Sequence, residues 1–150
     1  MPHTLLRCLL PFMLLLATCR AGSAAEPATA TVRVDGHEFQ VELAVSEAER
    51  ARGLMHRERL AADQGMLFVQ PQPAPAAFWM KNTLIPLDML FFDAEGRLLA
   101  LHQNVPPCTI PDCPIYPAAG PVKYILEVNA GTVRRLGIGP DARMVLPSND

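Results

Sequence analysis

Residues 78–92 read FWMKNTLIPLDMLFF, the most apolar stretch of the chain outside its N-terminus. Its second half, residues 87–93, is apolar on both faces, which is typical of a strand in the interior of a sheet. A cation, an amide and a hydroxyl nevertheless stand together at residues 81–83, and the carboxylate of Asp88 follows within the predicted strand. Because an unpaired buried charge costs several kcal/mol, these groups must be either exposed or paired.

Short strands and turns flank this stretch. Residues 32–34 and 39–45 alternate between apolar and polar side chains around Asp35-Gly36, a preferred type I′ turn, and so predict a β-hairpin. Ser46 to Glu49 is a capping box that predicts a short helix ending at Gly53. We predict further strands at residues 65–69, 78–80, 87–93, 97–105, 124–128 and 142–146, helices at 47–52 and 132–136, and a proline-rich loop, PQPAPAA, at 71–77 that cannot join a central ladder.

This pattern predicts a mainly β chain, a single-domain sandwich or jelly-roll-like barrel with one or two short helices. We expect the domain to span residues 31–150, after a disordered leader at 26–30. The formal charge of −2 and the two lysines offer no footprint for nucleic acid or for an anionic membrane surface.

The N-terminus is typical of a targeting segment. Residues 8–19 are an apolar run too short to span a bilayer, and Ser23-Ala24-Ala25 supplies small residues for a signal peptidase. We therefore expect a cleavable signal peptide at residues 1–25, cut after Ala25, no membrane span afterwards, and a periplasmic or secreted protein. Two competing interpretations are an uncleaved membrane anchor and lipidation of Cys19, which ends a LATC sequence close to a lipoprotein box.

Cys108 and Cys113 remain after the signal is removed, in the sequence PPCTIPDCP. A close pair of cysteines in a secreted protein predicts a disulfide. The competing interpretation is a metal site, but two thiolates make only half of a tetrahedral zinc shell and no histidine lies within a few residues. We expect no cofactor.

Five stretches carry a resemblance to a known family. In chain order they are RGLM, GMLF, FWMKNT, IPLDMLFFD and ILEVNAG, between Arg52 and Gly131. With these stretches the chain resembles the exported bacterial and archaeal family called domain of unknown function 192, over residues 31–146. The resemblance implies a mainly β, jelly-roll-like domain and no biochemical activity. The chain departs from the family at Gly139-Pro140-Asp141, where Pro140 interrupts a Gly-Asp dipeptide.

Two interpretations of the polar group in residues 78–92 remain open. In the first, residues 81–83 form an exposed turn and Asp88 pairs with Lys81 or Arg52, or accepts backbone amides of the turn. In the second, they belong to a pocket with apolar walls, in which a few polar groups bind a small polar ligand, a glycan or an envelope partner. The candidate ligand-binding residues are Arg52, Trp79, Lys81, Asn82 and Asp88.

Two other functions compete with this non-catalytic binding module. A small hydrolase acting on an envelope glycan would use Asp88 and Glu127 as a carboxylate pair, and the distance between them would be diagnostic. Glu127 lies in the predicted strand at 124–128, where we expect it on the opposite face from Ile125, either pointing outward or completing the polar cluster. Soft-metal binding is the other function, because thioethers suit Cu(I) and methionines are numerous at Met55, Met66, Met80 and Met89. Methionine at apolar positions is also ordinary core packing.

Overall fold

The sheet begins with the hairpin that Asp35-Gly36 predicts. In the computed structural model, which describes residues 26–146, β1 (Thr29–Val34) pairs antiparallel with β2 (His37–Ala44). Both turn residues have positive φ, 47° at Asp35 and 84° at Gly36, as a type I′ turn requires. The local sequence therefore determines this hairpin, and the prediction is confirmed.

The capping box also forms as predicted and begins α1 (Glu47–Arg52). The Ser46 hydroxyl accepts from the Glu49 amide at 3.2 Å, and the Glu49 carboxylate accepts from the Ser46 amide at 2.7 Å. These bonds, led by the one from the Ser46 amide, lower the pKa of Glu49. Gly53, at φ 48°, ends the helix. An added Cβ there would meet the Phe68 ring at 3.1 Å, so glycine also lets the chain pass close to that ring.

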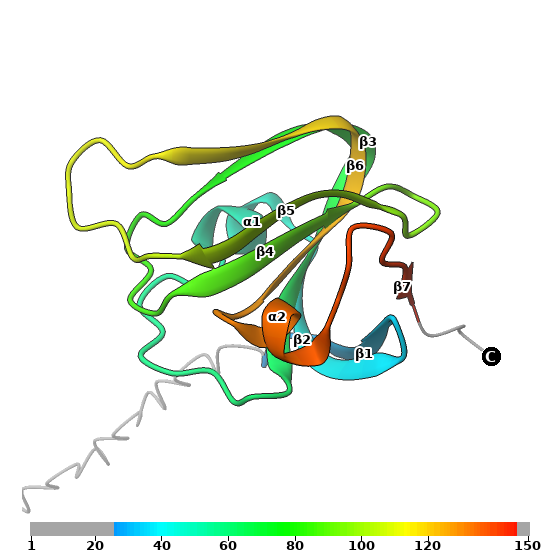
Figure 1. Ribbon diagram of the computed structural model, residues 1–150. Coiled ribbons are helices and arrows are strands. Elements are labelled where there is room, and N and C mark those ends of the chain that lie inside the picture. The colour runs from blue at the N-terminus through cyan, green and yellow to red at the C-terminus, as the bar shows by residue number, and fades with distance from the viewer. Residues whose placement is uncertain (1–25, 147–150) are drawn as a thin grey trace, which may run out of the picture.

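Two long strands replace the predicted proline-rich loop. β3 (Gln64–Trp79) and β6 (Ile115–Asn129) pair antiparallel over most of their lengths and bend sharply together (Figure 1). The prediction of a loop at 71–77 is wrong, because Ala74, Ala76 and Ala77 have partners in β6. In the described chain only β3 residues 64–68 also pair with β2, and only β6 residues 124–129 also pair with β4. The rest of the two strands forms a two-stranded arm, whose unpaired outer edges and register shifts tolerate proline.

The remaining elements complete one seven-stranded sheet in the order β5-β4-β6-β3-β2-β1-β7. β4 (Leu87–Phe92) lies between β5 (Leu98–Val105) and β6, and all six of its residues are buried. The predicted helix after β6 is α2 (Thr132–Leu136), and the last predicted strand shortens to β7 (Met144–Val145). The sheet curls into a half-barrel with two short helices, which confirms the predicted mainly β class.

The core lies on both faces of the curled sheet, because side chains alternate along β4. Leu90 and Phe92 belong to a cluster with Val32 and Val133, from β1 and α2. Met89 and its neighbours on the other face belong to a second cluster, composed of Ala44, Leu54, Met66, Phe68, Met80, Leu87, Met89, Phe91, Val105, Ala118, Val122 and Ile125. The second cluster supplies the walls of the site described below.

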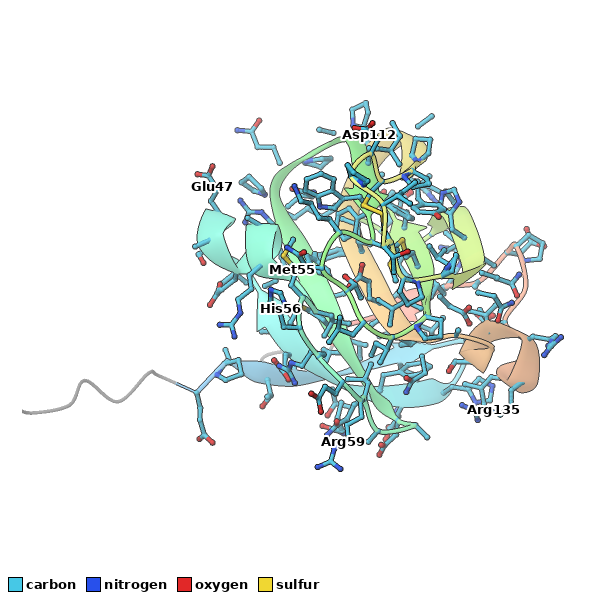
Figure 2. All side chains as sticks on the ribbon, turned by 90° about the vertical axis from the view of Figure 1, so that its left-hand side faces the viewer. Glu47, Met55, His56, Arg59, Asp112 and Arg135 are labelled. Carbon is cyan, nitrogen blue, oxygen red and sulfur yellow. A yellow bond between two sulfur atoms is a disulfide. The ribbon has the colours of Figure 1, made fainter. Side chains whose placement is uncertain are left out.

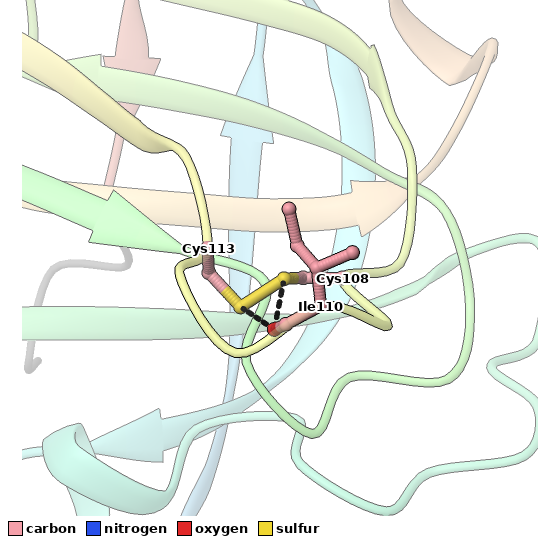
Figure 3. Close-up of a disulfide and its surroundings, with 3 residues drawn as sticks. All are labelled: Cys108, Ile110 and Cys113. Atoms are coloured by element: carbon pink, nitrogen blue, oxygen red, sulfur yellow. Dashed lines mark hydrogen bonds between the residues drawn. A yellow bond between two sulfur atoms is a disulfide. The ribbon is translucent and has the colours of Figure 1, made fainter.

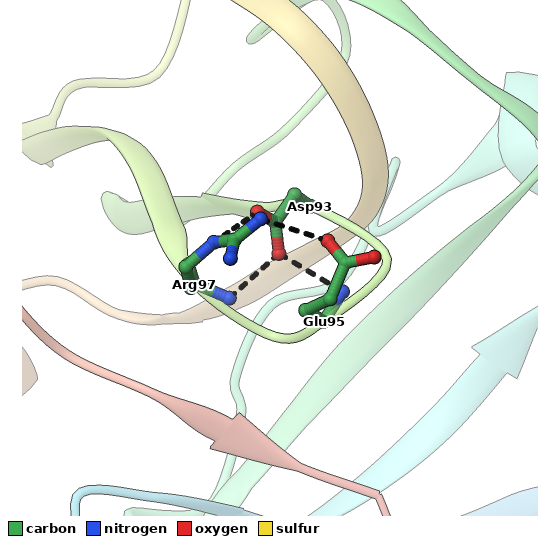
Figure 4. Close-up of polar contacts among 3 residues, drawn as sticks. All are labelled: Asp93, Glu95 and Arg97. Carbon is green, nitrogen blue, oxygen red and sulfur yellow. Dashed lines mark hydrogen bonds and ion pairs between the residues drawn. The ribbon is translucent and has the colours of Figure 1, made fainter.

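Asp93 fixes the turn between β4 and β5 (Figure 4). It is buried and accepts from the backbone amides of Glu95 and Arg97 and from the Arg97 guanidinium, at 3.0, 2.8 and 2.7 Å. Burial alone would raise the pKa of Asp93, but the bonds from Arg97 outweigh it and lower that pKa. This carboxylate is therefore a structural one.

The predicted disulfide is present between Cys108 and Cys113, whose Cα atoms lie 5.7 Å apart. Figure 3 shows both sulfur atoms against the carbonyl oxygen of Ile110, at 3.4 and 3.6 Å. The bridge closes the loop between β5 and β6, and Cys108 makes an isolated β-bridge to Lys81. The disulfide loop is thereby held beside the polar turn at residues 81–83.

The predicted signal peptide at residues 1–25 lies outside the described residues, as does Cys19 with its predicted lipidation. Within residues 26–146, neither helix has the length and apolar character that crossing a membrane requires.

Candidate functional site

Asp88 is a structural carboxylate on the face of the sheet that carries α2. It is fully buried and accepts three backbone amides, from Asn104 at 2.8 Å, Gly131 at 3.2 Å and Val133 at 2.9 Å. Backbone amides are thus its donors, but they come from distant segments and not from the turn at 81–83. An ion pair between Asp88 and Lys81 or Arg52 does not form. Asp88 therefore ties three segments together and has no free oxygen directed at a ligand.

The polar turn at 81–83 is partly exposed and partly buried. Asn82 takes the left-handed conformation expected of it, at φ 57°, and its carbonyl accepts from the His56 amide at 2.8 Å. The Asn82 side chain is exposed and contacts Met55, with 3.9 Å between amide nitrogen and sulfur. Lys81 is exposed, whereas Thr83 is buried. Figure 2 shows Met55 and His56 in the segment that follows α1. Both residues contact Asn82, so this segment and the turn at 81–83 lie side by side.

A pocket of about 200 Å³ opens between this turn and the end of α1. Its exposed mouth carries Arg52, Trp79 and Lys81, three of the five predicted ligand-binding residues. Asn82 lies beside the pocket without lining it, and Asp88 lies on the opposite face of the sheet. The full lining comprises Arg50, Ala51, Arg52, Gly53, Leu54, Met55, Phe68, Ala77, Phe78, Trp79, Lys81, Thr83 and Glu127.

The mouth of the pocket is cationic. Lys81 Nζ lies 5.0 Å from the centroid of the half-exposed Trp79 ring, a cation–π contact. Arg50 donates to the carbonyls of Val45 and Val69. Within residues 26–146, neither Arg52 nor Lys81 forms an ion pair with a carboxylate. The mouth therefore carries two cationic side chains, Arg52 and Lys81, that form no ion pair with an acidic residue of the described chain.

The floor is apolar except for two side chains, Thr83 and Glu127. The Phe68 and Phe78 rings meet edge to face, with centroids 4.7 Å apart. Glu127 is only 4% exposed and receives no hydrogen bond from the described residues. Burial raises its pKa to about 8, so the carboxyl is mostly protonated at neutral pH. An unpartnered carboxyl in an apolar cleft is a typical feature of a functional site.

Glu127 and Asp88 lie on opposite faces of the sheet. Glu127 is directly opposite Met89 of β4, whereas Asp88 is opposite Val128 of β6, so alternation sends the two carboxyl groups to different sides. The separation that would identify a glycan hydrolase is therefore not met. The expectation that Glu127 faces away from Ile125 is also wrong, because residues two apart along a strand share a face, and Ile125 belongs to the core cluster beside the pocket.

The methionines pack in the core rather than converging on an open site. Met66, Met80 and Met89 are buried members of the second core cluster, and Met55 lines the pocket near Asn82. In the described part of the chain, no three His, Cys, Asp or Glu side chains come close enough to hold a metal. These positions favour packing for the methionines.

Sequence reasoning missed several pocket residues. It left open whether Glu127 points outward, completes the polar cluster or pairs with Asp88, and it did not include Arg50 or Phe68 in the site. The sequence does contain a signal for Glu127: it is the single acidic residue in the otherwise apolar run ILEV at 125–128, which indicates a buried carboxyl group. A charged residue in such a strand needs a partner or a pocket, and the pairing of β6 with β3 supplies the pocket.

Comparisons with known proteins agree with this fold. The family model of domain of unknown function 192, described as an uncharacterized ACR, matches residues 30–146. A crystal structure from Sinorhizobium meliloti 1021, described as a candidate transcription regulator, is 40% identical with a TM-score of 0.77, covering 83% of this chain and 98% of that one. A protein of unknown function from Novosphingobium aromaticivorans DSM 12444 is also 40% identical, with a TM-score of 0.73, covering 81% of this chain and 94% of that one. No curated protein matches the chain.

Proposed function

The chain belongs to the family domain of unknown function 192, and on that premise we propose that it is a non-catalytic module that binds a small polar ligand carrying an anionic group, such as a carboxylate. The single observation that carries the proposal is the pocket of about 200 Å³ whose mouth holds Arg52 and Lys81 without acidic partners among the described residues. A glycan or an envelope partner would reach the same mouth only through a group small enough to enter it.

The chemistry of the lining supports an organic anion. The guanidinium of Arg52 can bind a carboxylate through two parallel hydrogen bonds, and the ammonium of Lys81 adds a second positive charge. Phe68, Phe78 and Leu54 offer apolar surface for the rest of the molecule. Apolar walls with a few polar groups are the usual composition of small-molecule sites. The volume favours a molecule of few heavy atoms.

We also infer that the protein is exported after cleavage behind Ala25, as a single domain at residues 31–150 with a short leader at 26–30. The Cys108–Cys113 disulfide supports an oxidising compartment, and the first 25 residues have the composition of a signal peptide.

A thermal-shift screen tests the binding function, because a ligand that binds the folded state raises its melting temperature. The probes are small carboxylates and their uncharged amides. We expect carboxylates to raise the melting temperature more than the amides do. Arg52→Ala and Lys81→Ala should abolish the shift while leaving the melting temperature without ligand nearly unchanged, since both side chains are exposed.

Arg135→Ala is the matched control. Arg135 is an exposed arginine of α2, far from Met55 in Figure 2, so its loss removes one positive charge without touching the pocket. Equal loss of the shift in this variant would mean that general charge, rather than the pocket, attracts the carboxylates. Lower stability of Lys81→Ala with an unchanged ligand shift would assign Lys81 a structural role and contradict the proposal.

A further inference from the structure

The binding of an anion leaves one feature of the pocket unexplained, the carboxyl group of Glu127. Its neighbours across the sheet are Met66 of β3 and Met89 of β4, neither of which can donate a hydrogen bond. No other described side chain or backbone amide donates to it, and it is 96% buried while lining the pocket. Among the described residues, every side-chain oxygen or nitrogen that is fully shut off from solvent has a partner, so the small exposed part of Glu127 includes its carboxyl oxygens and faces the pocket. A hydrogen-bond partner for this carboxyl therefore has to come from the pocket.

We propose that the ligand is a small zwitterion of the amino acid class, whose ammonium group binds Glu127 on the floor while its anionic group binds Arg52 and Lys81 at the mouth. This inference rests on the proposed function and adds a second charged group to its ligand.

The arrangement of charge in the pocket favours a zwitterion over a simple anion or a simple amine. A simple anion would satisfy the cations at the mouth but leave the Glu127 carboxyl without a partner. A simple amine is positively charged and would be repelled by the three cationic side chains of the lining, Arg50, Arg52 and Lys81. It carries no negative group whose attraction to these side chains would offset that repulsion. A molecule with one charge of each sign, oriented with its ammonium inward, satisfies both ends of the pocket.

The remaining lining fits an inward ammonium. The Thr83 hydroxyl on the floor can accept a second hydrogen bond from it. Phe68 and Phe78 line the same space, and aromatic rings attract a desolvated ammonium through their faces. A pocket of about 200 Å³ is small compared with sites for drug-sized ligands, as an amino acid requires.

Binding of an ammonium should release a proton. Burial raises the pKa of Glu127 to about 8, so the empty pocket holds a neutral acid at pH 7. An adjacent ammonium favours the charged form, so the carboxyl ionises and its proton passes to the buffer. The charged groups that line the same space are Arg50 and Arg52 from α1 and Lys81 from the turn, whereas the cross-strand neighbours Met66 and Met89 do not titrate.

Calorimetry with three matched series of probes tests the inference on the purified protein. The probes are the free amino acids, their N-acetyl derivatives, which keep only the anion, and their C-terminal amides, which keep only the ammonium. We expect at least one free amino acid to bind about tenfold or more tightly than either of its masked forms, as loss of a charge-assisted hydrogen bond predicts. Measured at pH 7 in two buffers of different ionisation enthalpy, its binding should release close to one proton.

Glu127→Gln keeps the shape of the side chain and removes its ionisation. This variant should bind the free amino acid about tenfold or more weakly and should release no proton on binding. Its affinity for the N-acetyl derivative should equal that of the unaltered protein. Arg135→Ala should change none of these quantities. If the Gln variant does not fold, proton release by the unaltered protein still decides the question.

The outcomes separate the two proposals. N-acetyl forms that bind as tightly as free amino acids would overturn the zwitterion and leave the anion-binding function standing. Amides that bind as tightly as free amino acids would overturn both, because the anionic group would then be dispensable. Absence of binding in all three series would also overturn both. Tight binding of a free amino acid without proton release would overturn the contact with Glu127.

Discussion

At the scale of single residues, the two buried carboxylates of the sheet have opposite roles. Asp88 is saturated by three backbone amides, whereas Glu127 has no hydrogen-bond donor among the described residues. Both are acidic residues within apolar strands, so composition alone does not distinguish them. The face that each one occupies, set by strand alternation, decides which carboxylate holds the fold and which one is available to a ligand.

Removing the Asp88 carboxylate should destabilise the protein without changing its ligand. Asp88→Ala leaves three amides without an acceptor, and we expect a loss of about 3 kcal/mol or more in the free energy of unfolding. Asp88→Asn keeps one acceptor oxygen and should lose less. Urea denaturation measures both values. If Asp88→Asn kept full stability and lost the thermal shift by carboxylates, Asp88 would be a ligand residue.

Glu127 should make the empty protein less stable as the pH rises. Burial raises its pKa to about 8, from the ordinary 4.5 that applies in the unfolded chain. Between these values the folded chain binds a proton that the unfolded chain does not, so the free energy of unfolding falls from about pH 5 to about pH 8 and then levels off. Glu127→Gln should remove this fall and be more stable above about pH 8, by on the order of a few kcal/mol.

Urea denaturation of both proteins across this pH range provides the measurement. Because the other titratable groups are common to both, the difference between the two curves isolates Glu127. Parallel curves would mean that the carboxyl is solvated or paired, contrary to the structure described.

At the scale of elements, the sequence predicts what is local and misses what is distant. The Asp35-Gly36 hairpin, the Ser46–Glu49 box and the end of α1 at Gly53 follow from neighbouring residues, and all three are confirmed. The arm of β3 and β6 was missed because its pairing joins segments about forty residues apart, and proline signals a loop when the partner strand is unknown.

The candidate site shows the same division. Trp79 and Lys81 are neighbours in the motif FWMKNT, and Arg52 begins the motif RGLM. All three line one pocket. Asp88 was placed in the site because it follows the polar turn, but its partners lie at 104, 131 and 133 and are invisible to local reasoning. The pocket role of Glu127 depends on the pairing of β6 with β3 and β4, which places this side chain in one lining with residues of α1.

The disulfide loop should stabilise both the fold and the pocket mouth. Replacing Cys108 and Cys113 together by alanine should lower the free energy of unfolding by about 2 kcal/mol, as expected for a short closed loop. Because Cys108 pairs with Lys81, the variant should also bind carboxylates more weakly. Urea denaturation and the thermal-shift screen measure the two effects. A loss of stability with unaltered binding would separate the loop from the pocket.

At the scale of the whole molecule, one sheet serves two purposes on its two faces. The first core cluster, with β1 and α2, holds the Asp88 network, while the second cluster forms the walls of the pocket. His102 of β5 connects the arm to β4 on the face of the second cluster. Its Nε2 lies 2.9 Å from the carbonyl oxygen of Pro117 in β6, and its ring meets those of Phe91 and Tyr116 edge to face. The folded arm and β5 thus enclose this face together.

Export should produce one domain with a defined start and no free thiol. We expect mass spectrometry of the exported protein to find Glu26 at the N-terminus, since residues 1–25 carry the signal features. Thiol titration of that protein, denatured but not reduced, should find no sulfhydryl, because Cys108 and Cys113 are bridged. A mass that includes a lipid on Cys19 would instead establish a membrane-anchored form, and two free thiols would contradict the disulfide.

The prolines of the β3–β6 arm have a consequence for how molecules meet one another. An open strand edge normally presents a row of amide donors to which a neighbouring protein can add a strand, and such recruitment leads to aggregation. Pro71, Pro73, Pro75, Pro117 and Pro121 have no amide hydrogen to offer along the arm. The arm can therefore extend beyond the sheet and form one wall of the pocket while offering an added strand fewer donors than an ordinary edge does.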